Sequence, residues 1–370
     1  MIASADPRAS YLAHQAEIEA ALRSVLASGR YILGPQVEQF ERQFATYLGV
    51  GHAIGVGSGT DALHLALRAL AIGPGDCVIT VSNTAVATVA AIELAGAQPV
   101  LIDVDPDTFL MDLNRLQDAL KSPPGRVKAI IPVHLYGNAV DMPAVMELAN
   151  RHDLRVVEDC AQAHGAMFAD KKVGGFGHAA AFSFYPTKNL GGIGDGGAVV
   201  CNDAAIAQRC MLLRQYGWRE RYISEVKGMN TRLDEIQAAV LAVKLGHLDK
   251  ENARRRQISD VYTRSLAGTS VSAPHVPAGA FHVYHQYVVR SARREALGRR
   301  LESAGISTQI LYPVPIHAQP AYKDHIAIAG GGLAVTESLA RQILSLPIHP
   351  QLDDSEVARV AGVAAESADD

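Results

Sequence analysis

The sequence predicts an α/β protein in which helices cover a wide, mostly parallel sheet. Between residues 52 and 201, apolar β-branched runs alternate with segments of helical period, which is the pattern of parallel strands joined by crossover helices. The 370 residues are 48% hydrophobic and 19% charged, the proportions of an ordinary globular protein. One hydrophobic core stops growing at about 250–300 residues, so we expect two lobes.

Seven segments have the length and composition of strands. They are residues 52–56, 77–81, 99–104, 127–133, 154–159, 180–184 and 197–201. Segments such as 61–70 and 85–94 lie between them and have helical period. We therefore expect a seven-stranded central sheet.

Helices are predicted on both sides of this core. Residues 16–29 and 37–49 form two amphipathic segments, each ending in a glycine, the residue preferred just beyond a helix. Residues 233–266 form a long helical stretch that we expect to break near Gly246.

The C-terminal part differs in pattern. It has a strand at 285–290, a helix at 294–305, an extended run at 306–313 and two closing helices. We expect residues 1–250 to form the N-terminal helices and a large α/β domain, and residues 251–370 a small α+β domain.

Charge and composition exclude several classes of protein. A formal net charge of −4, with scattered Lys and Arg, does not provide the basic surface that nucleic acid needs. The first residues lack the pattern of a signal peptide, and no run of 18 apolar residues occurs, so we expect a cytoplasmic protein without a membrane partner. The four cysteines are far apart, which indicates buried apolar residues rather than a disulfide framework or a metal site.

The segment 55–67 has a Gly/Ser turn between a strand and a helix. Gly57 and Gly59 permit close backbone approach, and Thr60 adds a hydroxyl at the helix N-terminus, where the dipole favours an anion. The segment therefore indicates a phosphate site. The alternative, an ordinary strand-to-helix turn, is equally compatible with these residues alone.

Asp159 follows an apolar strand within the segment 154–166. It therefore lies at the carboxyl edge of the predicted sheet, where ligands of α/β proteins bind. A carboxylate there can pair with a pyridinium nitrogen and so make the ring an electron sink. A structural acid or helix cap is the alternative for this segment.

Lys188 lies between a short strand and a glycine-rich turn. Such a lysine is usually a surface residue, but the glycines suggest backbone packed around a ligand. Desolvation lowers the pKa of a lysine, and a neutral amine reacts with an aldehyde. Ser183, on the preceding strand, adds a hydroxyl suited to a phosphate.

Four ordered motifs together resemble the DegT/DnrJ/EryC1/StrS family of sugar aminotransferases. They are GSGTDAL, EDCAQAHGA, FSFYPTKNLGGIGDGG and GMNTRLDEIQAAVL, and the resemblance extends from about Tyr31 to Ile348. It implies pyridoxal 5′-phosphate (PLP) as cofactor and the fold type I of aspartate aminotransferase, with a large domain and a small C-terminal α+β domain.

The resemblance implies a role for each matching residue. Lys188 would be the Schiff-base lysine and the general acid/base, and Asp159 would hold the pyridine nitrogen. Gln162 would contact the ring-oxygen side. The residues implied to hold the phosphate are Gly59, Thr60, the amide of Asp61, and Ser183. Asn230 would reach the phosphate of the neighbouring subunit, which implies a homodimer with shared sites.

Substrate-side residues are less clearly indicated. Tyr185 lies beside the lysine, and Tyr312 and His317 belong to a segment similar to the family's substrate-side segment. Arg219 and Arg221 suit a diphosphate, although a solvated loop explains them equally well. His134 and Tyr136, also in a familiar segment, have no assigned role.

One position departs from the family. Many members have an aromatic residue over the cofactor ring at the position of Ala85. Either Ala85 and its neighbours cover the ring with smaller groups, or an aromatic side chain comes from elsewhere.

The resemblance implies transfer of an amino group, most often from L-glutamate, to a nucleotide-linked keto-deoxysugar. The segment 83–105 is most similar to members that aminate C3 of a dTDP-3-keto-6-deoxyhexose. Amination at C4 of a UDP- or GDP-linked 4-ketohexose is the alternative. A sugar dehydratase would have histidine in place of Lys188, and a Rossmann oxidoreductase would have a different glycine turn. A non-catalytic regulator of the same fold is the remaining rival.

Overall fold

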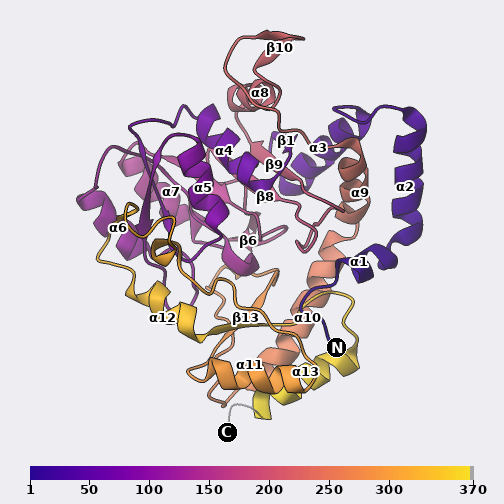
Figure 1. Cartoon of the computed structure of the whole chain (residues 1–370), viewed down its shortest axis with the longest axis vertical. Coiled ribbons are helices and arrows are strands. Elements are labelled where there is room, and N and C mark those ends of the chain that lie inside the picture. Colours follow the sequence, from indigo (N-terminus) through magenta and orange to yellow (C-terminus); the bar gives the residue numbers. More distant parts are fainter. Residues whose placement is uncertain (367–370) are drawn as a thin grey trace.

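The computed structural model describes residues 1–366, and within them eight strands form one central sheet (Figure 1). The strand order is β1-β9-β8-β5-β4-β2-β3-β14. Neighbouring strands are parallel from β8 to β14, whereas β9 is antiparallel to both β1 and β8. The strands are β1 (His52–Val56), β2 (Cys77–Val81), β3 (Gln98–Ile102), β4 (Val127–Ile130), β5 (Arg155–Asp159), β8 (Ala179–Ser183), β9 (Gly197–Cys201) and β14 (Ala327–Ile328).

The seven predicted strands are confirmed, but the central sheet has eight strands among the described residues instead of the predicted seven. The additional strand, β14, has two residues and comes from the C-terminal part of the chain. It pairs in parallel with β3 at the sheet edge. Two residues are too few to show alternation in sequence, and this is why the strand was missed.

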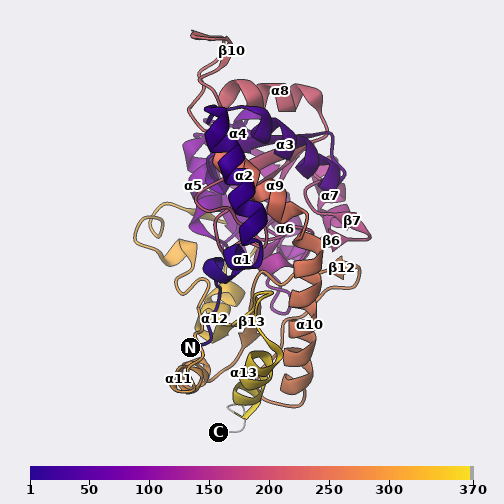
Figure 2. The same cartoon turned by 90° about the vertical axis from the view of Figure 1, so that its right-hand side faces the viewer.

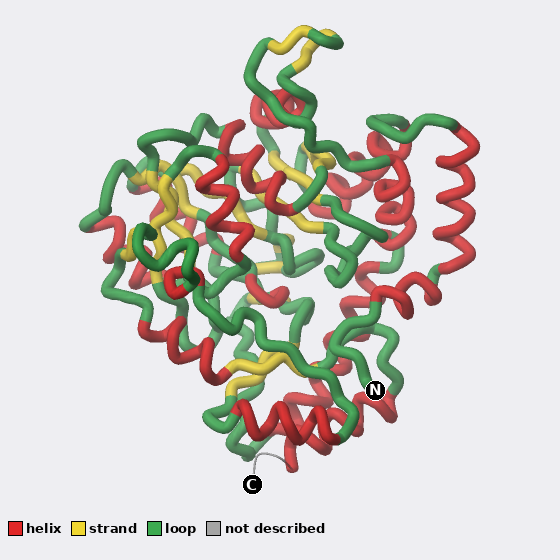
Figure 3. Tube along the Cα trace, viewed as in Figure 1, coloured by secondary structure: helices red, strands yellow, loops and turns green. Residues whose placement is uncertain are grey.

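Helices surround the sheet, with the strands at the centre of the larger part of the molecule (Figure 3). The helices are α1 (Pro7–Ala13), α2 (Gln15–Ser28), α3 (Pro35–Leu48), α4 (Gly59–Ala69), α5 (Val86–Leu94), α6 (Leu113–Lys121), α7 (Met142–Arg151), α8 (Ala204–Leu213), α9 (Glu235–Leu245), α10 (Leu248–Leu266), α11 (Arg294–Ser303), α12 (Ala334–Gln342) and α13 (Asp354–Glu366). Short 3-10 helices occur at Leu135–Gly137 and Ile316–Ala318.

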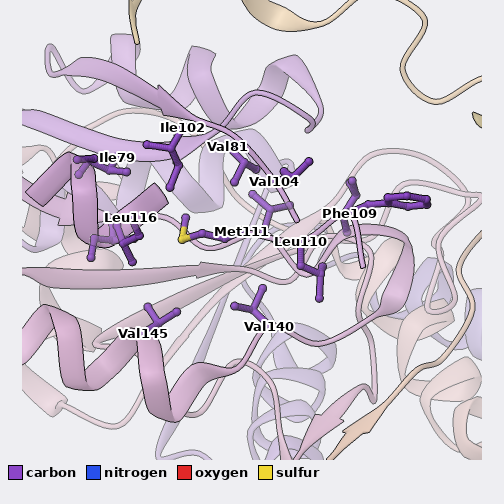
Figure 4. Close-up of a cluster of buried hydrophobic side chains, with 14 of the residues drawn as sticks. Ile79, Val81, Ile102, Val104, Phe109, Leu110, Met111, Leu116, Val140 and Val145 are labelled. Atoms are coloured by element: carbon purple, nitrogen blue, oxygen red, sulfur yellow. The ribbon is translucent and has the colours of Figure 1, made fainter. Parts of the chain in front are cut away.

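Apolar side chains on both faces of the sheet form the core of this larger part. On one face, α4, α5 and α8 bury aliphatic residues against the strands. On the other, Ile79, Ile102, Leu116 and Val145 join β2 and β3 to α6 and α7 (Figure 4). The parallel strands, buried on both faces, therefore read as continuous apolar runs in the sequence.

The predicted helix ends are confirmed. The helices α2 and α3 end at Gly29 and Gly49, whose φ angles of 66° and 71° suit glycine. The long stretch breaks at Gly246, where α9 ends and α10 begins.

The C-terminal part has a core of its own. Strands β13 (Tyr287–Arg290) and β15 (Ile343–Leu346) pair antiparallel, and α10, α11 and α13 pack around them. Ile2 joins this core from the N-terminus through a bridge to Ile306. The division at residues 250 and 251 stays a prediction.

Three short pairings complete the strands. Strand β6 (Met167–Phe168) pairs with β7 (Lys171–Lys172) and β12 (Ala280–Phe281). Strands β10 (Trp218–Glu220) and β11 (Ile223–Ser224) form a hairpin that projects from the body (Figures 1 and 2).

Two predictions from composition can be compared with the structure. All four cysteines are buried and free, as expected. Among residues 1–366, no helix combines the length and the apolar character that a membrane span requires.

Glu235 fixes the start of α3 from a distant point in the chain. Its buried carboxylate accepts hydrogen bonds from the backbone N–H groups of Gly34 at 2.8 Å, Gln36 at 3.0 Å and Val37 at 2.9 Å. The first N–H groups of a helix have no acceptor within the helix, so the carboxylate satisfies groups that would otherwise lack protein partners. It also attaches α3 to α9.

We expect Glu235→Ala to lower the free energy of unfolding by about 3 kcal/mol, because two buried N–H groups and one partly buried N–H group lose a charged acceptor. Denaturant unfolding measures this change. The exposed Glu38, in the first turn of α3, is the control, and its alanine variant should lose less than about 1 kcal/mol. Equal losses in both variants would show that Glu235 has no special role.

Candidate active site

A pocket of about 230 Å³ lies at the carboxyl ends of β5 and β8, beside the N-terminus of α4. Strands β5 and β8 are parallel neighbours, with Asp159 paired to Ala181, so the segments that follow them meet at this edge. The predicted residues that line the pocket are Gly59, Thr60, Asp159, Gln162, Ser183, Tyr185 and Lys188. Larger surface hollows have neither the lysine nor the aspartate in their lining.

Asp159 is the last residue of β5 and is buried. Its Oδ2 accepts a hydrogen bond from Thr88 Oγ1 at 2.8 Å, and its Oδ1 accepts one from the N–H of Ala161 at 3.1 Å. Burial raises the pKa of the carboxyl, while the Thr88 hydroxyl and the charge of Lys188 oppose this rise. Each oxygen retains a lone pair, so the carboxylate is able to accept a hydrogen bond from a cationic N–H group.

Lys188 is half-buried in the turn that follows β8. Its backbone N–H donates to the carbonyl of Tyr185 at 2.8 Å, which fixes the turn. Burial lowers the pKa of the amine to about 8, and Asp159 limits the decrease. A substantial fraction of the amine is therefore neutral near pH 8, as reaction with an aldehyde requires.

The N-terminus of α4 provides donors for an anion. The Ser58 hydroxyl caps the helix by accepting from the N–H of Asp61 at 3.1 Å. The N–H groups of Gly59 and Thr60 have no acceptor within the helix, because the first amides of a helix never do. A Cβ on Gly59 would lie 2.7 Å from Cβ of Ser183, so only glycine brings the helix this close to β8.

The Asp61 amide therefore already has a partner. The Asp61 carboxylate accepts from Thr231 Oγ1 at 2.8 Å, and Thr231 in turn accepts from the N–H of Gly57 at 2.9 Å. These bonds connect the start of α4 to the segment before α9. The implied phosphate contact of the Asp61 amide stays a prediction.

Gln162 joins the pocket to the C-terminal part of the chain. Its Oε1 accepts from the N–H of Tyr136 at 2.7 Å, and its Nε2 donates to the Tyr312 hydroxyl at 3.0 Å. Tyr136 OH contacts the carbonyl of Leu311. Burial and nearby Asp159 raise the pKa of Tyr312 to about 12, so this hydroxyl stays neutral near pH 7.

Two buried residues that sequence reasoning left aside hold Asp159 in place. Glu158 accepts from the N–H groups of Gly174, Phe176 and Gly177 at 2.7–2.8 Å and lies 3.2 Å from His134 Nε2. Burial alone would raise the pKa of Glu158, but His134 and the backbone donors lower it below the usual value. His134 therefore has a structural role behind β5.

The remaining predicted residues lie outside the pocket of their own chain. His317 Nδ1 is 2.7 Å from Ser82 Oγ, and its Nε2 is 3.2 Å from Glu337. Arg219 is exposed on the β10–β11 hairpin and pairs with Glu225 at 2.6 Å. Arg221 follows on the same hairpin, and Asn230 is exposed and bridged to Gln215.

The side of the pocket near α5 is lined by small residues. Thr84, Ala85 and Ala87 all contribute to it, and Tyr185 is the aromatic member of the lining among the described residues. The lining thus has small groups beside Ala85 and one aromatic side chain from the lysine segment, and both alternatives for the Ala85 position stay predictions. Asp195 also lines the pocket. Sequence patterns do not reveal Thr84, Thr88 or Asp195, because isolated polar residues have no periodic signal.

The arrangement fits PLP. The open amides of α4 suit its phosphate, Asp159 suits its pyridine nitrogen, and Lys188 suits its aldehyde. The contact between Gly59 and Ser183 brings the phosphate end and the lysine segment together.

We expect PLP uptake by the apoprotein to accelerate as the pH rises through about 8 and then to level off, because only the neutral amine reacts. Stopped-flow absorbance measures the rate. Borohydride reduction followed by peptide mass spectrometry should identify Lys188, and Lys188→Ala should lose this label. A midpoint near 10.5, the usual lysine value, would show that burial does not lower this pKa.

The sequence matches a known protein family over nearly its whole length. The model of the DegT/DnrJ/EryC1/StrS aminotransferase family matches residues 13–364. The dTDP-3-amino-3,4,6-trideoxy-alpha-D-glucose transaminase of Streptomyces venezuelae is 47% identical over 98% of this chain and 95% of its own. The dTDP-3-amino-3,6-dideoxy-alpha-D-galactopyranose transaminase of Aneurinibacillus thermoaerophilus is 45% identical, over 97% and 98%.

A solved structure has the same fold. The crystal structure of S. venezuelae DesV in complex with a ketimine intermediate is similar with a TM-score of 0.96 and 47% identity, covering all of this chain and 99% of DesV. The family match extends over nearly the whole chain. Of the residues that the resemblance implies, Gly59, Thr60, Asp159, Gln162, Ser183 and Lys188 line the pocket, while Asn230 lies outside it. The chain belongs to the DegT/DnrJ/EryC1/StrS aminotransferase family and is a PLP-dependent aminotransferase of fold type I.

Proposed function

We propose that the protein transfers an amino group from an amino acid, with L-glutamate as the expected donor, to C3 of a dTDP-linked 3-keto-6-deoxyhexose. The observation that carries this proposal is the 45–47% identity, over nearly full length, to two transaminases named for dTDP-3-amino sugars. The Lys188 and Asp159 pair supports the amino transfer itself, because both groups that this chemistry needs line one pocket.

The residues around the pocket have distinct tasks in this proposal. When bound, PLP supplies an electron sink for the carbanion formed at the amino carbon. Lys188 moves the proton, since an amine with a pKa near 8 both accepts and donates at neutral pH. Asp159, held by Thr88 and the Ala161 amide, would hold the ring nitrogen through its negative charge.

Two tyrosines would position the substrate, one in the lining of the pocket and one hydrogen-bonded to the lining residue Gln162. Tyr185 lines the pocket with 53% of its surface exposed, so its ring is available to a ligand. Tyr312 accepts from Gln162 and, as a neutral phenol, still has a proton to donate to a sugar hydroxyl or carbonyl oxygen.

We also propose a homodimer with shared sites, acting in the cytoplasm. Asn230 and Arg219 do not reach the pocket of their own chain, and the hairpin that bears Arg219 projects away from the body (Figure 2). Tyr222 and Ile223 at its tip are 73% and 59% exposed. A second copy would cover these apolar groups and receive Asn230 at its cofactor phosphate.

Two other functions are alternatives to this proposal. Amination at C4 of a UDP- or GDP-linked 4-ketohexose would use the same lysine and aspartate. A non-catalytic regulatory protein would need neither, and the intact pocket therefore argues against it.

The amino-loaded enzyme should aminate the dTDP-3-keto-6-deoxyhexose with kcat/KM at least about 100-fold above that for UDP- and GDP-4-keto sugars. Return of the PLP absorbance and mass spectrometry of the product measure this. Lys188→Ala should lose about 10²–10⁴-fold in turnover, whereas Lys250→Ala, on an exposed part of α10, should retain it. Preference for a 4-keto sugar would support the alternative reaction, and no amination at all would favour the regulator.

The shared site predicts complementation between two defective variants. Lys188→Ala and Asn230→Ala should each have low activity as homodimers. After dissociation and random reassociation, about half the dimers are mixed, and each contains one intact site, so activity should recover to about a quarter of wild type. Mixing without recovery, although native mass spectrometry shows mixed dimers, would mean that Asn230 acts within its own chain.

A further inference from the structure

We propose that His14, Glu17 and His247 form a binding site for a divalent transition-metal ion such as Zn²⁺. His14 lies between α1 and α2, and His247 lies between α9 and α10; Figures 1 and 2 both show these two junctions side by side. The ligand atoms of the three residues all lie within 4.8 Å of one another. Two imidazoles and a carboxylate form a donor set that suits Zn²⁺.

The spacing of the donor atoms is close to that of ligands sharing one ion. Two ligands at about 2.1 Å from a tetrahedral ion are about 3.4 Å apart. His247 Nε2 lies 3.2 Å from both Glu17 oxygens. The His14 and His247 rings stack at 4.0 Å between centroids, with 17° between their planes, so the two imidazoles are neighbours. Binding one ion requires the rings to turn until their in-plane lone pairs converge. The side chains of His247 and Glu17 are partly exposed, which leaves them room for this rotation.

Glu251 is a positioning residue for this site. Its Oε1 lies 2.9 Å from His14 Nε2, and Gln351 Nε2 donates to the same oxygen at 3.4 Å. A histidine that donates one ring proton to a carboxylate has its other nitrogen free to bind a metal. The carboxylate also fixes the orientation of the ring and increases its basicity.

Accessibility separates this site from a second compact group. His134, Glu158 and Cys160 also lie within 4.8 Å of one another, but they are fully buried. There, Glu158 accepts hydrogen bonds from three backbone N–H groups, and His134 Nδ1 accepts one from the N–H of Val140. The atoms that could bind a metal are therefore already occupied by backbone partners. At the helix junctions, by contrast, the side chains of His247 and Glu17 are 30% and 58% exposed, so an ion reaches them directly.

The site would connect parts of the chain that are far apart in sequence. The ion would link the N-terminal helices to the α9–α10 junction. Because these ligands are assembled only in the folded chain, binding would stabilise the fold and raise the melting temperature. This inference does not depend on the proposed sugar substrate.

The test uses the PLP-loaded protein without a polyhistidine tag, titrated with ZnCl₂ by calorimetry and with CoCl₂ by visible absorbance. We expect one ion per chain, a rise in melting temperature with Zn²⁺, and Co²⁺ absorption bands of a site with nitrogen and oxygen ligands. His247→Gln and Glu17→Gln should each weaken binding at least about tenfold and abolish the rise in melting temperature.

The exposed His325 provides the matched control, since His325→Gln removes a surface imidazole elsewhere and should bind like wild type. Glu17 is exposed, so its variant reports on binding even if His247→Gln does not fold. Wild-type protein that binds less than one Zn²⁺ per chain would overturn the proposal. Equal binding by wild type and both ligand variants would overturn it as well, because the ion would then lie elsewhere.

Discussion

The pocket depends on the electrostatic interaction between the half-buried amine of Lys188 and the buried carboxylate of Asp159. Burial disfavours both charges, and it therefore lowers the pKa of the amine and raises that of the carboxyl. Each charge opposes the shift of the other. The result is an amine with a pKa near 8, which exchanges a proton near neutral pH, beside an acid held by Thr88 and Ala161.

The fold brings this pair together through neighbouring parallel strands. Asp159 ends β5, and Lys188 follows β8, which pairs with β5 in register. Behind the pair, Glu158 accepts three backbone N–H groups and contacts His134, so the end of β5 is held on its far side. The catalytic groups therefore lie on a rigid edge of the sheet, while Gln162 connects that edge to Tyr312 from the C-terminal part.

Much of the fold and of the candidate site could be predicted from the sequence, because the patterns that indicate them involve residues close together in the chain. Buried parallel strands appear as apolar runs, helix ends as glycines, and the phosphate turn, Asp159 and Lys188 each lie at a predicted strand end. The features that were missed join distant residues. Glu235 caps a helix about 200 residues earlier in the chain, and polar pairings at such separations have no periodic signal. Asn230 raises a further difficulty, since its predicted role requires a second chain.

The central claim is that Asp159 and burial together set the protonation of Lys188. Competitive acetylation of the apoprotein across a pH series, quantified for the Lys188 peptide by mass spectrometry, measures this pKa directly. For wild type we expect a midpoint near 8. In Asp159→Asn the midpoint should fall below the wild-type value, because the carboxylate that favours the charged amine is gone. A midpoint that is unchanged or higher in this variant would contradict the account.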